Sequence, residues 1–351
     1  MIALKTIKHT LYVCLFPVVL MIWATACARH EQLEEQQQDE VEIRINSGIT
    51  VVASSAVTRA GEGMIDQTLK SDLNVSFVRA DKSEGASPAY PSVYGTGLLA
   101  GTVSHTAANT PLSFSPKAYY LRDGRSSKLA GCYPQGGTYQ QADRTVSLAV
   151  DGSTDIMVTK LVEGDRSSPV AAISFEHVLT QVSVQAYAAD DAAKTLWGGI
   201  KSVKIKGMKQ SCMITFPDPS TANAGADVEV AFSGTDDLDL IKKNPADNKD
   251  IQEGAGVYGD TNPLTLGIGK DNAVLAGYAM FAPVGAGADA KVTLEITMGD
   301  MPSETKEVPL AAGYLKAGSY LISLKFISSG VEPAVAVEQW KTGASPDEIE
   351  L

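Results

Sequence analysis

The stretch VEIRINSGITVVA, residues 41–53, sets the pattern that most of the chain follows. Apolar residues alternate with polar or charged ones on both sides of Ser47-Gly48. Alternation with a period of two is typical of a β-strand with one buried face, and a glycine inside it marks a break. The sequence therefore predicts a first strand over 41–53 that is interrupted at Gly48. Its expected buried residues are Ile43, Ile45, Ile49 and Val51.

The rest of the chain consists of short β-type runs separated by turn residues. Such runs occur at 75–78, 145–150, 155–162, 181–187, 203–205, 273–282, 291–298 and 319–327. Asp151-Gly152 between two of these runs is the strongest hairpin signal in the sequence, and 190–197 is expected to form one or two helical turns. An all-β fold of two antiparallel β-sandwiches with few helices is the economical architecture.

Length and composition favour a folded protein with two domains. The chain has 351 residues, of which 44% are hydrophobic and 20% are charged, so it can bury real cores. There are 29 Lys and Arg against 41 Asp and Glu, which gives a net charge of -12. Such an acidic chain lacks the positive charge that neutralises phosphates, so we expect no nucleic acid partner.

The N-terminus has the features of an export signal. Lys5 and Lys8 precede an apolar run over 11–24, which has the length of a signal-peptide core and is short for a membrane span. The following Ala24-Thr25-Ala26-Cys27 resembles the lipobox of bacterial lipoproteins. We expect a signal peptide over 1–26 and acylation of Cys27, for example with palmitate; an ordinary cleavage site beside an incidental cysteine is the alternative. Loss of 1–26 removes two lysines and no acid, which takes the net charge from -12 to -14.

The sequence predicts that two segments near the first strand are accessible to solvent. Residues 30–42 are polar and acidic, which is typical of a tether. Residues 54–63, SSAVTRAGEG, place Arg59 among small, flexible residues. A loop of this kind is a preferred site of proteolysis, so Arg59 is a candidate for protease processing.

The sequence contains no motif for metal, phosphate or nucleophile chemistry. HExxH, CxxC, the P-loop and GxSxG are all missing from the chain, so we expect no catalytic residue, cofactor or metal. A carboxylate pair for glycoside hydrolysis stays open, because its geometry depends on the fold. Beyond Cys27 lie Cys132 and Cys212, which could pair after export; we expect each to be a small buried apolar residue instead.

Seven short motifs occur in a fixed order along most of the chain. They are Thr58-Arg59-Ala60, Tyr119-Tyr120-Leu121-Arg122-Asp123-Gly124, Cys132-Tyr133-Pro134, Asp155-Ile156-Met157, Phe175-Glu176-His177-Val178-Leu179, Leu315-Lys316-Ala317-Gly318-Ser319-Tyr320 and Trp340-Lys341-Thr342-Gly343. Their order and spacing resemble the fimbrillin family (Mfa-like, type V pilins) of Bacteroidales outer-membrane lipoproteins.

The resemblance implies a fold and a mechanism. The fold is a pair of transthyretin-like antiparallel β-sandwich domains in tandem, here 60–172 and 173–351, preceded by a lipidated tether and removable first strand over 27–59. In such precursors an Arg-specific protease cuts after the first strand, here after Arg59. A neighbouring subunit's C-terminal strand then fills the opened groove by β-augmentation. The donor candidates are Val335, Val337 and Trp340, although Pro346 in the tail removes a backbone donor.

The resemblance also implies location and partners. We expect an outer-membrane lipoprotein at the cell surface, in a fimbrium, that serves cell adhesion and contacts other pilin subunits and a host or bacterial receptor. A stalk, tip or anchor position stays open, and an anchor would need no cut at Arg59.

Two other functions are kept as alternatives. One is a surface lipoprotein that binds glycans through exposed tyrosines such as Tyr119, Tyr120 or Tyr133 and never polymerises. The other is a glycoside hydrolase on a β-sandwich. Phe175, His177 and Leu179 are expected to be packing residues at the domain junction, with His177 a hydrogen-bonded core imidazole.

Overall fold

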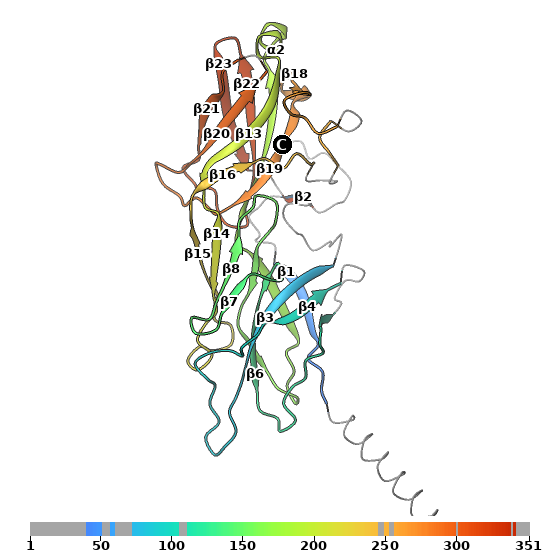
Figure 1. Cartoon of the computed structure of the whole chain (residues 1–351), viewed down its shortest axis with the longest axis vertical. Helices are drawn as coiled ribbons and strands as arrows, with labels where there is room; N and C mark the ends of the chain where they lie inside the picture. Colours follow the sequence, from blue (N-terminus) through green and yellow to red (C-terminus); the bar gives the residue numbers. More distant parts are fainter. Residues whose placement is uncertain are drawn as a thin grey trace, which may run out of the picture.

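The protein is built from β-strands, as the sequence predicts. In the computed structural model the described residues are 40–50, 57–59, 72–104, 111–244, 249–252, 256–299, 301–337 and 340–341. Figure 1 shows two β-rich bodies that follow one another along the long axis. One contains β3 (Leu73–Asp81) and β6 (Ser127–Tyr133), and the other contains β13 (Gly199–Met208), β20 (Lys291–Met298) and β22 (Ser319–Ile327). None of the described helices is long and apolar enough to cross a membrane.

The N-terminal body contains a sheet that closes into a ring of seven strands. The order is β6-β3-β4-β5-β1-β11-β9, and β9 pairs again with β6. The members are β1 (Ile45–Thr50), β3 (Leu73–Asp81), β4 (Leu99–Val103), β5 (Pro111–Phe114), β6 (Ser127–Tyr133), β9 (Met157–Thr159) and β11 (Ala172–His177), while β10 (Val162–Gly164) also pairs with β6. The all-β prediction is confirmed. The ring differs from an open sandwich because Cys132 and Tyr133 of β6 pair with Val158 and Met157 of β9.

A second, four-stranded sheet covers the barrel and unites distant parts of the chain. It runs β15-β14-β8-β7, from β7 (Thr138–Gln140), β8 (Thr145–Ala149), β14 (Ser211–Thr215) and β15 (Glu229–Ser233). The pair β14–β15 therefore completes a sheet that begins about 70 residues earlier in the sequence, since Met213 of β14 lies opposite Ser147 of β8.

The hairpin prediction at Asp151-Gly152 is wrong. β8 pairs with β7 and β14, whereas β9 pairs with β6 and β11, so the turn joins two different sheets. The Asp151 carboxylate accepts hydrogen bonds from the backbone N–H groups of Ser153 and Thr154, each at 2.8 Å. The carbonyl of Gly152 accepts the N–H of Met280 at 2.8 Å. These bonds fix a turn that sends the chain across the core instead of back along β8.

The C-terminal body is a sandwich of two sheets. One sheet holds β12 (Thr180–Ala188), β18 (Gly267–Ile268), β19 (Val274–Phe281), β22 (Ser319–Ile327) and β23 (Gly330–Val337). The other holds β13 (Gly199–Met208), β16 (Asp236–Asp239), β17 (Leu264–Thr265), β20 (Lys291–Met298) and β21 (Glu304–Pro309). The predicted short helix is α2 (Asp191–Trp197), whose N-cap Asp190 accepts the N–H of Ala193 at 2.8 Å.

Three apolar cores run along the molecule. One fills the ring of seven strands, one lies between this ring and β14, and one fills the C-terminal sandwich. Cys132 and Cys212 are both free thiols in the middle core, as predicted. His177 is buried, and its Nδ1 lies 2.6 Å from an Asp155 carboxylate oxygen, so the predicted hydrogen-bonded core imidazole is confirmed.

Phe77 sits at the centre of the barrel and depends on a glycine. Its ring packs edge-on against Phe114 and Phe175, with centroids 5.5 and 6.1 Å away. The opposite side of the ring lies over Gly131 of β6, where an added Cβ would come within 2.7 Å of the ring. Glycine is required here because the backbone of β6 and the Phe77 ring approach closely.

We expect Gly131→Ala to lower the free energy of unfolding by about 1–3 kcal/mol, because the Phe77 ring must shift within a filled core. Guanidinium denaturation followed by circular dichroism measures this change. The matched control is Gly97→Ala, since nothing lies within 4 Å of the added Cβ there. Equal midpoints for the two variants would show that the Phe77 contact does not restrict Gly131.

Candidate strand-exchange site

The strand β1 lies inside the ring and has a neighbour on each side. It pairs in parallel with β11 over five residues, from Asn46 opposite Ala172 to Thr50 opposite Glu176. On its other side it pairs antiparallel with β5 over two residues, with Ile45 opposite Leu112. Within the described residues, β5 and β11 do not pair with each other. An N-terminal strand thus bridges two strands that come later in the sequence.

The pairing extends toward the N-terminus beyond β1. The N–H of Ile43 donates to the carbonyl of Ala118 at 2.8 Å, and the N–H of Tyr120 donates to the carbonyl of Val41 at 2.9 Å. The segment with the Tyr119-Tyr120 motif is therefore a partner of the first strand. Alternation within 41–53 predicts a strand but carries no information on its partner, so sequence reasoning missed this contact.

Ile43 and Ile45 fix the strand to the barrel core. They are 1% and 0% exposed and lie in the same cluster as Phe77, Leu112 and Phe175. Their burial confirms the alternation that the sequence shows. Ile49 is in β1 opposite Phe175 in the register, and Val51 lies outside the described residues.

The outward face of the same segment carries surface ion pairs. Arg44 Nη2 lies 2.8 Å from a Glu42 carboxylate oxygen, and Lys117 Nζ lies 3.5 Å from the same oxygen. The hydrogen bond from Arg44 holds the pKa of Glu42 below its usual value. The Arg44 side chain is 65% exposed, and exposed pairs contribute little to stability. The buried isoleucines, and not these charges, hold the strand in place.

Arg59 lies at the end of a short strand that pairs with the C-terminal region. β2 (Val57–Arg59) runs parallel to β24 (Trp340–Lys341), with Arg59 opposite Lys341. A two-stranded ribbon is at best marginally stable in water. Local opening of this ribbon therefore needs little free energy.

The predicted donor residues occupy the last strands. β23 is an edge strand that pairs with β22, where Val335 lies opposite Ile322 and Val337 opposite Tyr320. Val335 packs half-buried against the C-terminal core, and Trp340 lies in β24. Donation of Val335 and Val337 would require β23 to leave β22. The predicted lipidation site Cys27 lies outside the described residues.

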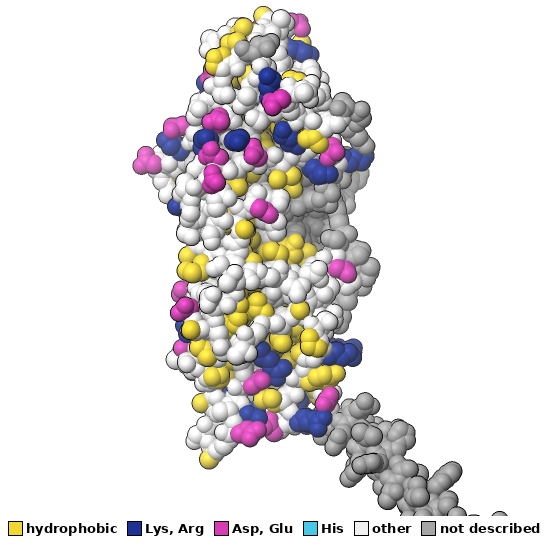
Figure 2. Space-filling model, viewed as in Figure 1, with side chains coloured by type: hydrophobic (Ala, Val, Ile, Leu, Met, Phe, Trp, Pro, Cys, Tyr) yellow, Lys and Arg dark blue, Asp and Glu magenta, His cyan; other side chains and the backbone are white. Residues whose placement is uncertain are grey.

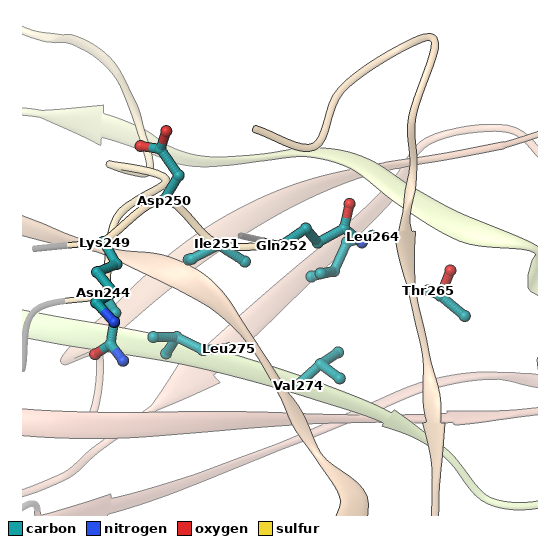
Figure 3. A pocket seen from close by; sticks show the side chains of 9 residues that line it. All are labelled: Asn244, Lys249, Asp250, Ile251, Gln252, Leu264, Thr265, Val274 and Leu275. Carbon is teal, nitrogen blue, oxygen red and sulfur yellow. The ribbon is translucent and has the colours of Figure 1, made fainter. Parts of the chain in front are cut away.

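The described surface has two hollows. The first has a volume of about 330 Å³ and is lined by Ile251, Val274 and Leu275 among others (Figure 3). Asp250 also lines it, and its carboxylate lies 3.0 Å from Lys243 Nζ. The second, of about 500 Å³, includes Glu176 and Asp227. Lys160 lies 2.8 Å from Asp227, and its hydrogen bond holds the pKa of that carboxyl group below its usual value.

No group of three or more His, Cys, Asp or Glu side chains in the described part of the chain is arranged to hold a metal ion. The carboxyl pKa shifts that are resolved among the described residues are all downward. They affect Glu42, Asp123, Asp151, Asp218, Asp227 and Asp237.

The tyrosines considered for sugar stacking differ in exposure. Tyr120 is 3% exposed, and its hydroxyl oxygen accepts the N–H of Val170 at 2.8 Å, so it is a core residue. Tyr133 packs half-buried against the barrel core.

On the face shown in Figure 2, basic and acidic side chains are interspersed, without a continuous basic patch.

Comparison with known proteins places this all-β fold in a family. The fimbrillin-like family profile matches residues 58–340. The chain therefore belongs to the fimbrillin-like family, as its motifs suggest. A search of curated proteins finds no match.

The chain is also similar to several solved structures. A proposed cell adhesion protein from Bacteroides uniformis has 17% identity and a TM-score of 0.52, with 86% of this chain and 100% of that one covered. Another from Bacteroides ovatus has 16% identity and a TM-score of 0.50, over 87% and 99% of the two chains. The tip fimbrial protein Mfa3 from Porphyromonas gingivalis has 10% identity and a TM-score of 0.39, over 86% and 100%.

We expect Ile45→Ala to lower the free energy of unfolding by about 2–5 kcal/mol, because it leaves a cavity beside Leu112 in the barrel. Arg44→Ala on the outward face is the matched control and should cost about 1 kcal/mol or less. Both are measured by guanidinium denaturation of the chain that begins at Ala28. If the two variants lose equal stability, β1 is not anchored by its buried face.

The two core thiols provide a test of the middle core. Burial raises the pKa of Cys132 and of Cys212 to about 12, so almost no thiolate is present at pH 8. We expect iodoacetamide to leave both unmodified in the native chain from Ala28 and to add two groups in 6 M guanidinium, as read by intact mass. Native labelling at the rate of a free cysteine would contradict their burial.

Proposed function

We propose that the protein is a structural or adhesive subunit of a surface pilus, exported as a lipoprotein precursor, processed after Arg59 and assembled by β-strand exchange. It carries out no catalysis in this role. The observation that carries the proposal is the position of β1, an N-terminal strand that lies between β5 and β11 and buries Ile43 and Ile45 in the barrel core. The chain's membership of the fimbrillin-like family supports the same function.

Removal of β1 would create a binding site for another strand. The facing edges of β5 and β11 would lose their backbone partners, and the space of two isoleucines would open in an apolar core. An incoming extended strand with alternating apolar side chains would satisfy the backbone groups and refill the core at once. Both needs favour a strand from another pilin subunit as the partner.

A cut after Arg59 would also affect the C-terminal region, because β2 pairs with β24. β2 belongs to the segment that a cut after Arg59 would release, and β2 is the strand that pairs with β24. Release of β1 would therefore also deprive Trp340 and Lys341 of their partner. The family match covers residues 58–340, so β1 lies N-terminal to the matched residues. This boundary is consistent with a first strand that is absent from the mature subunit.

The lipid has a separate role in the proposal. Acylation of Cys27 would hold the precursor at the outer membrane, and the acidic segment 30–42 would give the folded body reach. A cut after Arg59 would release the body from this anchor for assembly. A subunit that stays uncut would keep its lipid and serve as an anchor.

The test treats the soluble chain that begins at Ala28 briefly with trypsin and compares it with the Arg59→Ala variant. We expect one early cut after Arg59, read as a new N-terminus by mass spectrometry, and heat-sensitive multimers on a denaturing gel. The variant should stay monomeric. A cut without multimers would indicate a tip or accessory subunit that awaits another donor.

Resistance at Arg59 together with a monomeric chain would overturn the proposal of processing and strand exchange. An anchor subunit or a glycan-binding lipoprotein that does not polymerise would then explain the chain better.

A further inference from the structure

Ser47 is an exception on the inward face of β1. Its hydroxyl oxygen is buried and has no hydrogen-bond partner among the described residues. Two residues earlier on the same face, Ile45 is fully buried, and Ser47 lies opposite Ile173 of β11 in the parallel register. Side chains two apart in a strand share a face, so Ser47 points where Ile45 points, toward the barrel core.

The other buried hydroxyls of this barrel do find partners. The Tyr120 hydroxyl oxygen accepts the N–H of Val170 at 2.8 Å. The Thr159 hydroxyl oxygen accepts the N–H of Gly131 at 2.8 Å and donates to the carbonyl of Lys160 at 3.1 Å. Barrel packing therefore tolerates hydroxyl groups where backbone partners are within reach. Ser47, by contrast, lies opposite Ile173, a residue of the apolar barrel core.

This mismatch weakens β1 at one position. A buried hydroxyl that loses water and gains no hydrogen bond lowers the stability of the state that buries it. An aliphatic side chain at the same position would give up no hydrogen bond to water when it is buried, and it would add apolar contact. The barrel thus holds its own first strand less tightly than it would hold a strand with an aliphatic residue there.

We propose that the position of Ser47 is the subsite at which the barrel distinguishes its own first strand from an incoming donor strand, and that this subsite prefers an aliphatic side chain. The partner it fits is an extended strand of another subunit with Ala, Val or Ile two residues after the one that replaces Ile45. The preference favours replacement over re-binding of β1, because an aliphatic residue at this position binds the barrel more tightly than Ser47 does. This inference rests on the proposed function.

The test measures how well peptides replace β1. The chain from Ala28 is cut after Arg59 and mixed with fluorescently labelled peptides of residues 40–59: the natural sequence, Ser47→Ala, and Asn46→Ala as the exposed control. We expect the Ser47→Ala peptide to displace β1 at about a tenfold lower concentration than the natural peptide. The Asn46→Ala peptide should differ by about twofold or less, because Asn46 faces solvent.

A second measurement does not require the cut. In the intact chain, Ser47→Ala should raise the equilibrium constant for folding by about tenfold, read from guanidinium denaturation, whereas Asn46→Ala should not raise it. If Ser47→Ala neither binds more tightly nor stabilises the intact chain, the subsite is overturned. If the cut chain takes up none of the peptides while Ser47→Ala still stabilises the intact chain, strand exchange fails and the mismatch at Ser47 stands.

Discussion

The need to pair every backbone N–H and C=O group of a sheet dominates the N-terminal body. β5 and β11 face one another across a gap that β1 fills, and the ring of seven strands closes through it. An unpaired strand edge next to an apolar core is unfavourable for two reasons: its backbone N–H and C=O groups lack partners, and apolar side chains of the core are exposed to water. The barrel therefore requires a strand at this position, but the backbone does not specify which chain supplies it.

The residues of the first strand differ in how strongly they hold it in the barrel. Ile43 and Ile45 fill the core, the ion pair of Glu42 and Arg44 lies on the surface, and Ser47 buries a hydroxyl without a partner. The proposed strand exchange would act on a strand that is bound in this way. In the exchange proposed above, release of β1 after a cut at Arg59 and its replacement by a donor strand would draw only on these burial free energies.

Local patterns predicted elements better than their connections. The helix at 190–197 and the burial of His177 followed from the sequence, because capping and apolar neighbours act over a few residues. The Asp151-Gly152 turn was assigned to a hairpin, since turn chemistry at these residues fits either a return along β8 or a crossing to β9. The bond from Met280 to Gly152, which comes from a distant strand, decided between them.

The sequence by itself determined that the chain is all-β and that Ile43 and Ile45 of the first strand are buried. The export signal over 1–26 and the accessible Arg59 stay predictions of the sequence. These properties depend on periods of two and on short motifs. Only the tertiary structure decided that β1 lies between β5 and β11, that β9 closes the ring, and that the Ser47 hydroxyl has no hydrogen-bond partner among the described residues. Strand pairing joins residues far apart in sequence, and a two-residue period is the same whichever strand lies alongside.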